Sequence, residues 1–291
     1  MAVVQVKTET VLIRSARLEW LPVLAGLLVL YVPTFYDFAN TLWPSDEHAH
    51  GPIILAVIVW LMWKGRAALF APAAEVSPAA GFVLLAFGLF FYVVGRSQSI
   101  AFFEMAALAP VLAGVLLAMR GWPALRALWF PVLFVVFMVP LPGTVVEMLT
   151  GPLKQSVSEI TVQILRLAGY PVAREGVIIT IRQYQLLVAD ACSGMNSMFS
   201  LSALGVLFMY QMARASLLHN GIILLSILPL AFAANIVRVL ALILITYHFG
   251  DEAGQGFLHG AAGMVLLLAS LSGLLLLDAV LARFLKPRKP A

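Results

Sequence analysis

The chain has 291 residues, of which 62% are hydrophobic and 11% are charged, and its mean hydropathy is +1.00. This composition excludes a soluble globular protein and predicts an all-α polytopic membrane protein. The formal net charge of +4 does not indicate nucleic-acid binding, because the basic residues of a membrane protein concentrate in its cytoplasmic loops. A single cysteine excludes an intramolecular disulfide.

Apolar stretches predict about eight transmembrane helices, since one span needs about 20 mainly apolar residues. We expect them in a single integral membrane domain that covers residues 1–291. The predicted spans are approximately residues 18–38, 52–63, 79–94, 100–119, 124–139, 194–212, 217–249 and 257–281. The run Pro140-Leu141-Pro142-Gly143 ends the fifth span, and Pro229 predicts a kink or a re-entrant break in the seventh.

The distribution of Lys and Arg predicts the orientation of these spans. If the amino terminus is inside, most basic residues lie in inside loops, Lys64, Arg66 and Arg120 among them. Most of the others lie in one long outside segment, residues 141–191, whose charges count less toward orientation. We therefore expect both termini in the cytoplasm, which requires an even number of spans.

The outside segment, residues 141–191, carries two different patterns. Apolar residues recur at helical spacing from 144 to 167, which predicts one or two amphipathic helices along the membrane interface. Gly169-Tyr170-Pro171 ends this pattern. Residues 176–189 are β-branched and aromatic on either side of Arg182-Gln183, which predicts a β-hairpin. The hairpin would bring the following residues to the membrane surface.

Those following residues, 190–198, contain Cys192 where a polar segment meets an apolar helix. A thiol at the first turn of a helix lies near the positive end of the helix dipole, which favours the nucleophilic thiolate. The alternative is a small apolar residue that fills space, as buried free cysteines commonly do. The polar neighbours Asp190, Ser193 and Asn196 are an unsuitable setting for such packing.

Two further residues on the outer side suggest chemistry. Arg238 lies three residues after Asn235 on one face of the seventh span, about 18 Å below Gly250 by the rise of a helix. If residues 251–256 form the last outer loop, His259 falls in the first turn of the eighth span. Taken singly, Arg238 could reach the headgroups and His259 could be an interfacial residue. With Cys192 they supply a nucleophile, a cation for an oxyanion and an acid for a leaving amine.

The motifs Ala191-Cys192-Ser193-Gly194, Asn235-Ile236-Val237-Arg238 and His259-Gly260, spread over eight predicted spans, resemble the exosortase family of bacterial membrane transpeptidases. Residues 190–198 most resemble its exosortase B branch. His50-Gly51 and Pro140-Leu141-Pro142 also resemble family features, so His50 is a possible substrate-site residue. The resemblance covers nearly the whole chain.

The resemblance implies an enzyme of the bacterial inner membrane with its active site on the periplasmic face. Its substrates would be membrane-tethered proteins with a C-terminal PEP-CTERM sorting signal, often in organisms that make exopolysaccharide. Carried over by position, the catalytic residues are Cys192, Arg238 and His259, with Asn235 in a supporting role. The acyl acceptor is left open between an amine, a lipid and water. No cofactor, metal or nucleic acid is implied.

Other readings remain open on the sequence alone. A transporter or channel would explain an Arg within the membrane and a broken helix at Pro229, although no inverted repeat is present. A structural scaffold for polysaccharide assembly would need only hydrophobicity. His48 and His50 could bind a cation, but no remote third ligand is evident. Asp278, in the inward part of the last span, has no partner that the sequence indicates.

Overall fold

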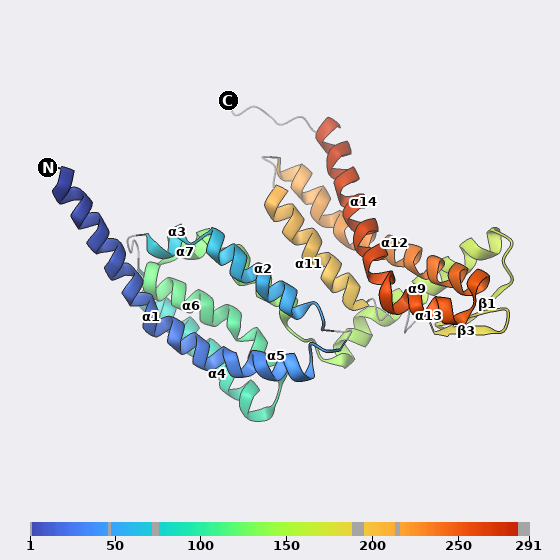
Figure 1. The fold of residues 1–291 in the computed structure, drawn as a ribbon, viewed down its shortest axis with the longest axis horizontal. Helices are drawn as coiled ribbons and strands as arrows, with labels where there is room; N and C mark the ends of the chain where they lie inside the picture. Colours follow the sequence, from blue (N-terminus) through green and yellow to red (C-terminus); the bar gives the residue numbers. More distant parts are fainter. Residues whose placement is uncertain (1, 46–47, 72–75, 188–194, 213–215, 285–291) are drawn as a thin grey trace. The chain divides into compact units, whose positions relative to one another are not determined.

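The computed structural model describes residues 2–45, 48–71, 76–187, 195–212 and 216–284 (Figure 1). The chain divides into two compact units, Met1–Leu141 and Pro142–Ala291. Among the described residues, 4 helices are long and apolar enough to cross a membrane: Leu18–Thr41, Pro78–Gln98, Ala101–Arg120 and Leu218–Phe249. Shorter apolar helices are Gly51–Lys64, Trp129–Met138 and Leu201–Met212. The predicted class of an all-α polytopic membrane protein is confirmed.

Helices are the only regular secondary structure in the described part of the first unit. Its elements are α1 (Ala2–Thr41), α2 (Gly51–Lys64), α3 (Ala67–Phe70), α4 (Pro78–Gln98), α5 (Ala101–Ala106), α6 (Leu108–Arg120), α7 (Trp122–Ala127), α8 (Trp129–Phe134) and the 3₁₀ helix η1 (Val135–Met138). The predicted fifth span is therefore broken into short pieces. Pro131 explains the break after Ala127, because a proline ring clashes with the carbonyl four residues before it.

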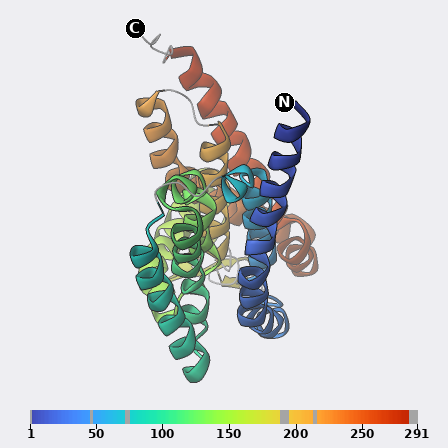
Figure 2. The ribbon, with the colours of Figure 1, turned by 90° about the vertical axis from the view of Figure 1, so that its left-hand side faces the viewer.

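Glycines let α4 and α6 pack with their backbones in contact, as small residues do between membrane helices (Figure 1, Figure 2). A Cβ atom on Gly81 would lie 2.6 Å from the amide nitrogen of Ala118. One on Gly88 would lie 2.9 Å from the amide nitrogen of Val111. Such distances are shorter than real Cβ contacts, so the interface requires glycine at these positions.

A polar network joins α1, α4 and α5 at one end of the first unit. The hydroxyl of Thr34 donates a hydrogen bond to the buried carboxylate of Glu104 at 3.0 Å. Arg96 lies 3.5 Å from the same carboxylate and 2.6 Å from Asp37. The charge of Glu104 is thus compensated where the helices meet, as buried charges generally are.

The second unit contains helices and a small sheet. Its elements are α9 (Gly143–Leu167), β1 (Val172–Glu175), β2 (Ile178–Ile181), β3 (Tyr184–Leu187), α11 (Met195–Met212), α12 (Leu217–Phe249), α13 (Asp251–Gly260) and α14 (Ala262–Phe284). The predicted amphipathic segment is one helix, α9, which continues through Pro152. It buries Val157, Val162 and Leu165 on one face.

The predicted hairpin is confirmed, with Arg182-Gln183 as its two-residue turn between β2 and β3. Arg182 has a φ of 52°, the left-handed conformation that such tight hairpin turns need. One strand was not predicted: β1 pairs antiparallel with β2 through a turn at Gly176, whose φ is 60°. The sheet therefore has three strands in the order β1-β2-β3.

Two predictions about the last helices need correction. Of the kink or re-entrant break predicted at Pro229, the break is wrong, because α12 is one helix of 33 residues that contains this proline, whereas the kink stays a prediction. Neighbouring helices can satisfy the backbone groups that a proline frees within a membrane helix. Residues 251–256 are not a loop, since α13 begins at Asp251. Asp251 and Glu252 occupy its first turn, where acidic side chains stabilise a helix.

Asp278 of α14 has a partner at the start of α12. Its Oδ1 atom lies 2.8 Å from Nε2 of His219, which is almost fully buried in the first turn of α12. The two residues are 59 positions apart in the chain. This contact joins the start of α12 to α14, and no sequence pattern indicates it.

Replacing Gly88 with leucine should destabilise the first unit by about 1–3 kcal/mol, because the new side chain must displace the backbone of α6. Thermal unfolding of the purified protein in detergent measures the change. Gly26→Leu is the matched control, since a Cβ atom at Gly26 meets nothing within 4 Å. Equal stability of the two variants would contradict the close packing of α4 and α6.

Candidate active site

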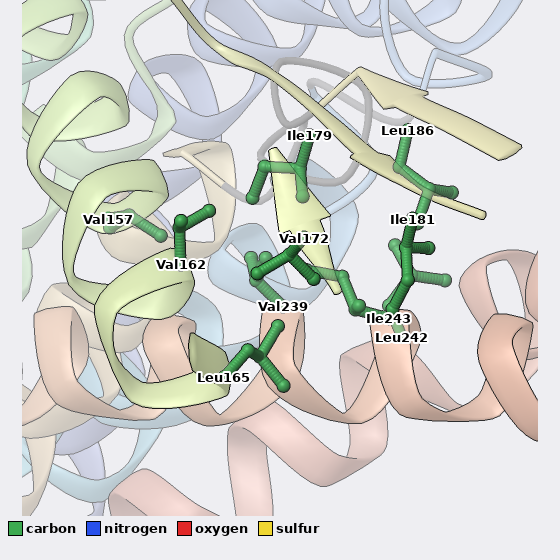
Figure 3. Close-up of a cluster of buried hydrophobic side chains, with 10 residues drawn as sticks. All are labelled: Val157, Val162, Leu165, Val172, Ile179, Ile181, Leu186, Val239, Leu242 and Ile243. Atoms are coloured by element: carbon green, nitrogen blue, oxygen red, sulfur yellow. The ribbon is translucent and has the colours of Figure 1, made fainter. Parts of the chain in front are cut away.

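A buried core fixes the small sheet to α9 and α12. Figure 3 shows the side chains of this core pointing toward one another from the three elements. Its buried members are Val157, Val162, Leu165, Val172, Ile179, Ile181, Leu186, Val239, Leu242 and Ile243. Ile179, Ile181 and Ile243 are fully buried, so the sheet rests directly on the second half of α12.

Aromatic and polar contacts reinforce this attachment near the end of α12. The guanidinium of Arg182, at the hairpin turn, lies 4.2 Å from the ring centre of Tyr247. The Tyr170 ring packs edge-on against Tyr247, with centroids 5.1 Å apart. The Tyr170 hydroxyl is 3.3 Å from Nε2 of His248. These contacts hold the turn between β2 and β3, and so the start of β3, beside the end of α12.

Arg238 and Asn235 lie in the middle of this assembly. Arg238 is 6% exposed and Asn235 is 1% exposed. Val239, the next residue, belongs to the core beneath the sheet. Ala231 and Ala234, one turn earlier, pack with Leu201 of α11 in a second buried cluster. A cation at such a place is costly, which is why buried arginines within membrane helices are typical of functional sites.

The packing of α11 sets the level at which that helix begins. Leu201 clusters with Ala231 and Ala234, and a Cβ atom on Gly205 would lie 2.8 Å from Ile227. The later residue of α11, Gly205, contacts the earlier residue of α12, Ile227, so the two helices run antiparallel. The same register carried back to Met195, the first residue of α11, brings the start of this helix level with Arg238.

Helix α13 also returns along α12, after a turn at Gly250 with a φ of 91°. A Cβ atom on Gly254 would lie 2.1 Å from Oγ1 of Thr246, so these helices are in close contact four residues on either side of the turn. His259 is nine residues after Gly250, and Arg238 is twelve residues before it. The antiparallel return therefore brings the backbone of His259 to within about 5 Å of the level of Arg238 along α12.

The position predicted for His259 is thus corrected. It lies in the last turn of α13, and not in the first turn of the last span, because residues 251–260 form a separate helix. The acidic pair Asp251-Glu252 is a helix-start signal that could have revealed this helix from the sequence. The side chain of His259 lies outside the part of the chain whose side chains are described.

Cys192, Asp190 and Ser193 also lie outside the described residues, which end at Leu187 and resume at Met195. Asn196 is in the first turn of α11, and its side chain is likewise not described. Only Ser193 and Gly194 separate Cys192 from Met195, so chain length alone keeps its Cα atom within about 11 Å of the start of α11. In the sequence, Cys192 lies between β3 and α11.

His50 belongs to the first unit, where it is half-buried immediately before α2. It lines a small recess with Trp43, His48, Met138 and Pro140. Burial lowers the pKa of His50, and the neighbouring His48 lowers it further, whereas a hydrogen bond with the backbone of Phe137 acts in the opposite direction. His48 Nδ1 lies 3.3 Å from the hydroxyl of Ser45.

The lowered pKa of His50 predicts acid sensitivity. The folded protein keeps this ring neutral, whereas an ordinary histidine binds a proton below about pH 6.5. Stability from this source is therefore present above about pH 6.5 and is lost as the pH falls toward the lower folded-state pKa. The drop in Tm between about pH 7.5 and about pH 5.5 should be smaller in His50→Gln than in the wild type.

If His50→Gln loses as much Tm on acidification as the wild type does, the burial of the His50 ring is not the source of the effect.

Comparison with known families gives one match. A family model described as transmembrane exosortase matches residues 40–276 of the chain. The matched range includes α11, α12 and α13, together with His50 and Cys192. Comparisons with curated proteins and with solved structures find no match. Since the family model covers most of the sequence, the chain belongs to the transmembrane exosortases, a family of membrane transpeptidases.

Proposed function

We propose that this protein is a membrane-embedded cysteine transpeptidase that cleaves the C-terminal PEP-CTERM sorting signal of exported proteins. Its nucleophile is Cys192, and Arg238 and His259 complete the site. The single observation that carries this proposal is the shared level on α12: the start of α11 and the backbone of His259 both come level with the buried Arg238. Three helices, α11, α12 and α13, thus have residues at one level of the unit.

The chemistry assigned to these groups is an acyl transfer. The Cys192 thiolate attacks the scissile carbonyl, and the resulting oxyanion is stabilised by the guanidinium of Arg238. Collapse of this intermediate breaks the C–N bond, and the imidazolium of His259 gives its proton to the leaving amine. The substrate then remains as a thioester on Cys192 until an amine, a lipid hydroxyl or water attacks it. The acceptor's proton returns to His259, and the thiolate leaves.

The remaining polar residues have positioning roles in this scheme. Asn235 shares a helix face with Arg238 and is buried beside it, so it can orient the guanidinium. Asp190, Ser193 and Asn196 flank the nucleophile in the chain and provide hydrogen-bonding groups around it. His50 remains a possible substrate-site residue of the first unit.

The proposed setting is the bacterial inner membrane, with both termini in the cytoplasm and the active site on the periplasmic face. In the first unit, Lys64, Arg66 and Arg120 all lie at helix ends, as the positive-inside rule requires of cytoplasmic loops. The partners are PEP-CTERM-tailed proteins tethered in the same bilayer, in an organism that makes exopolysaccharide. The branch of the family is proposed to be exosortase B.

A transport function receives no support from α12. Transporters of the broken-helix type bind substrate at interrupted spans near the midplane, whereas α12 is continuous past both Pro229 and Arg238. A reaction where α11 begins beside α12 therefore explains the buried Arg238 better than a permeation path does.

Co-expression with a PEP-CTERM-tailed protein tests the catalytic residues. Wild-type enzyme should remove a tail-sized fragment, Cys192→Ala should remove none, and Arg238→Gln should slow processing about 100-fold or more, the loss typical of one oxyanion donor. His259→Gln should also slow it. The measurement is the mobility of the tailed protein on a gel, with each variant quantified in the membrane fraction.

A surface variant serves as the matched control. Arg174→Gln removes an exposed cation of β1. It should process the substrate at the wild-type rate. Tail removal by Cys192→Ala would show that the thiol is not the nucleophile, and processing rates equal to wild type in Arg238→Gln would remove the proposed oxyanion role.

The contact between α13 and α12 offers a test of how His259 is positioned. Gly254→Leu should reduce processing about 100-fold, because a shift of about 1 Å in a catalytic group can cost that much and the new side chain must push α13 away from Thr246. Gly256→Leu is the control in the same helix, since a Cβ atom there meets nothing within 4 Å. Equal processing rates for the two variants would mean that the packing of α13 against α12 does not affect the reaction.

A further inference from the structure

An apolar groove of about 440 Å³ runs along the first unit, between α1 and α2, and reaches α3 and α6. Leu24, Leu28 and Phe35 of α1 line one side, and Ile58 and Val59 of α2 line the other. Of all the residues that line it, only Arg66 is charged. Nothing in the proposed reaction uses this groove, so its occupant must be argued separately.

The length of the groove matches one leaflet of a bilayer. Its lining residues on α1 extend from Leu24 to Phe35, eleven residues and therefore about 16 Å. Half of a hydrocarbon core about 30 Å thick is about 15 Å. An acyl chain that lies along the groove would therefore reach from the headgroup level to the middle of the bilayer.

The Arg66 end of the groove has the chemistry of a lipid headgroup site. The Arg66 guanidinium lies 4.6 Å from the ring centre of Trp63 and donates a hydrogen bond to the Trp63 carbonyl at 3.1 Å. Lys64 lies 5.3 Å from the ring centre of Trp60. Indole rings beside basic side chains are typical of the boundary between hydrocarbon and headgroups.

Charge compensation distinguishes Arg66 from the other arginine nearby. Arg120 forms an ion pair with Glu19 at 3.0 Å and donates to the carbonyl of Leu69 at 2.8 Å. Arg66 is exposed, and within the described part of the chain no carboxylate forms an ion pair with it. The groove therefore ends at a cation whose counterion is not supplied by these residues. An anionic headgroup at this position would supply it.

We propose that this groove binds one anionic phospholipid, with an acyl chain between α1 and α2 and its phosphate on Arg66. Basic residues at the ends of membrane helices recognise anionic lipids in this way. The lipid would fill the space beside Leu28 and Ile58 and neutralise the end of α2. This site is independent of the reaction proposed above, because all of its residues belong to the first unit.

The test uses the full-length protein, purified in detergent and stripped of lipid, with equal amounts of phosphatidylglycerol and phosphatidylcholine added back. Native mass spectrometry should show one bound phosphatidylglycerol. Arg66→Gln should reduce this binding about five-fold, the effect of one basic residue near an anionic surface. Arg126→Gln, an exposed arginine of α7 that does not line the groove, should leave it unchanged.

A second pair of variants tests the groove itself. Leu28→Trp fills it, whereas Val29→Trp adds the same side chain at the next residue of α1, which does not line the groove. Both positions are well exposed, so both variants should fold. Only Leu28→Trp should lose bound phosphatidylglycerol. Unchanged phosphatidylglycerol binding in Leu28→Trp would overturn the proposal. Equal binding of phosphatidylglycerol and phosphatidylcholine, with no effect of Arg66→Gln, would also overturn it. So would a photo-crosslinker at position 28 that captures a protein instead of lipid.

Discussion

Close packing against α12 is the constraint on which the second unit depends. Gly205 of α11 meets Ile227, and Gly254 of α13 meets Thr246, at distances that no larger residue would permit. The sheet is held on the same helix by the fully buried Ile243 and its neighbours. Because α11 and α13 both pack against α12, the start of α11 and the end of α13 come to the same level of that helix.

The buried position of Arg238 follows the same logic. A guanidinium that is 6% exposed in an apolar helix carries a large desolvation cost, and structural packing alone would not require it. The same low dielectric strengthens its attraction for a developing negative charge, which is what an acyl transfer produces. The cost in stability and the proposed catalytic value of Arg238 therefore have a single physical origin.

Local sequence patterns are sufficient to predict those elements whose structure depends on residues close together in the chain. Helical periodicity indicated α12, and β-branched residues on either side of Arg182-Gln183 indicated the hairpin. One failure is local, because the acidic pair Asp251-Glu252 marks the start of α13 where the prediction has a loop. The other concerns a contact between distant residues. The pairing of His219 with Asp278 spans 59 residues, and no local pattern could indicate it. For the candidate site, the sequence is sufficient to select Cys192, Arg238 and His259 by residue type. It does not show that the start of α11 and the end of α13 come level with Arg238 on α12.

The most direct test of the central claim is the pH dependence of alkylation at Cys192, which is unambiguous because the chain has a single cysteine. If Arg238 and His259 lie beside the thiol, the rate of reaction with iodoacetamide should rise at a midpoint well below the value of about 8.5 for an ordinary thiol. Arg238→Gln should move that midpoint upward, and Arg174→Gln should not. A midpoint at or above about 8.5 that neither substitution changes would contradict the account, because it would place Cys192 away from the buried arginine.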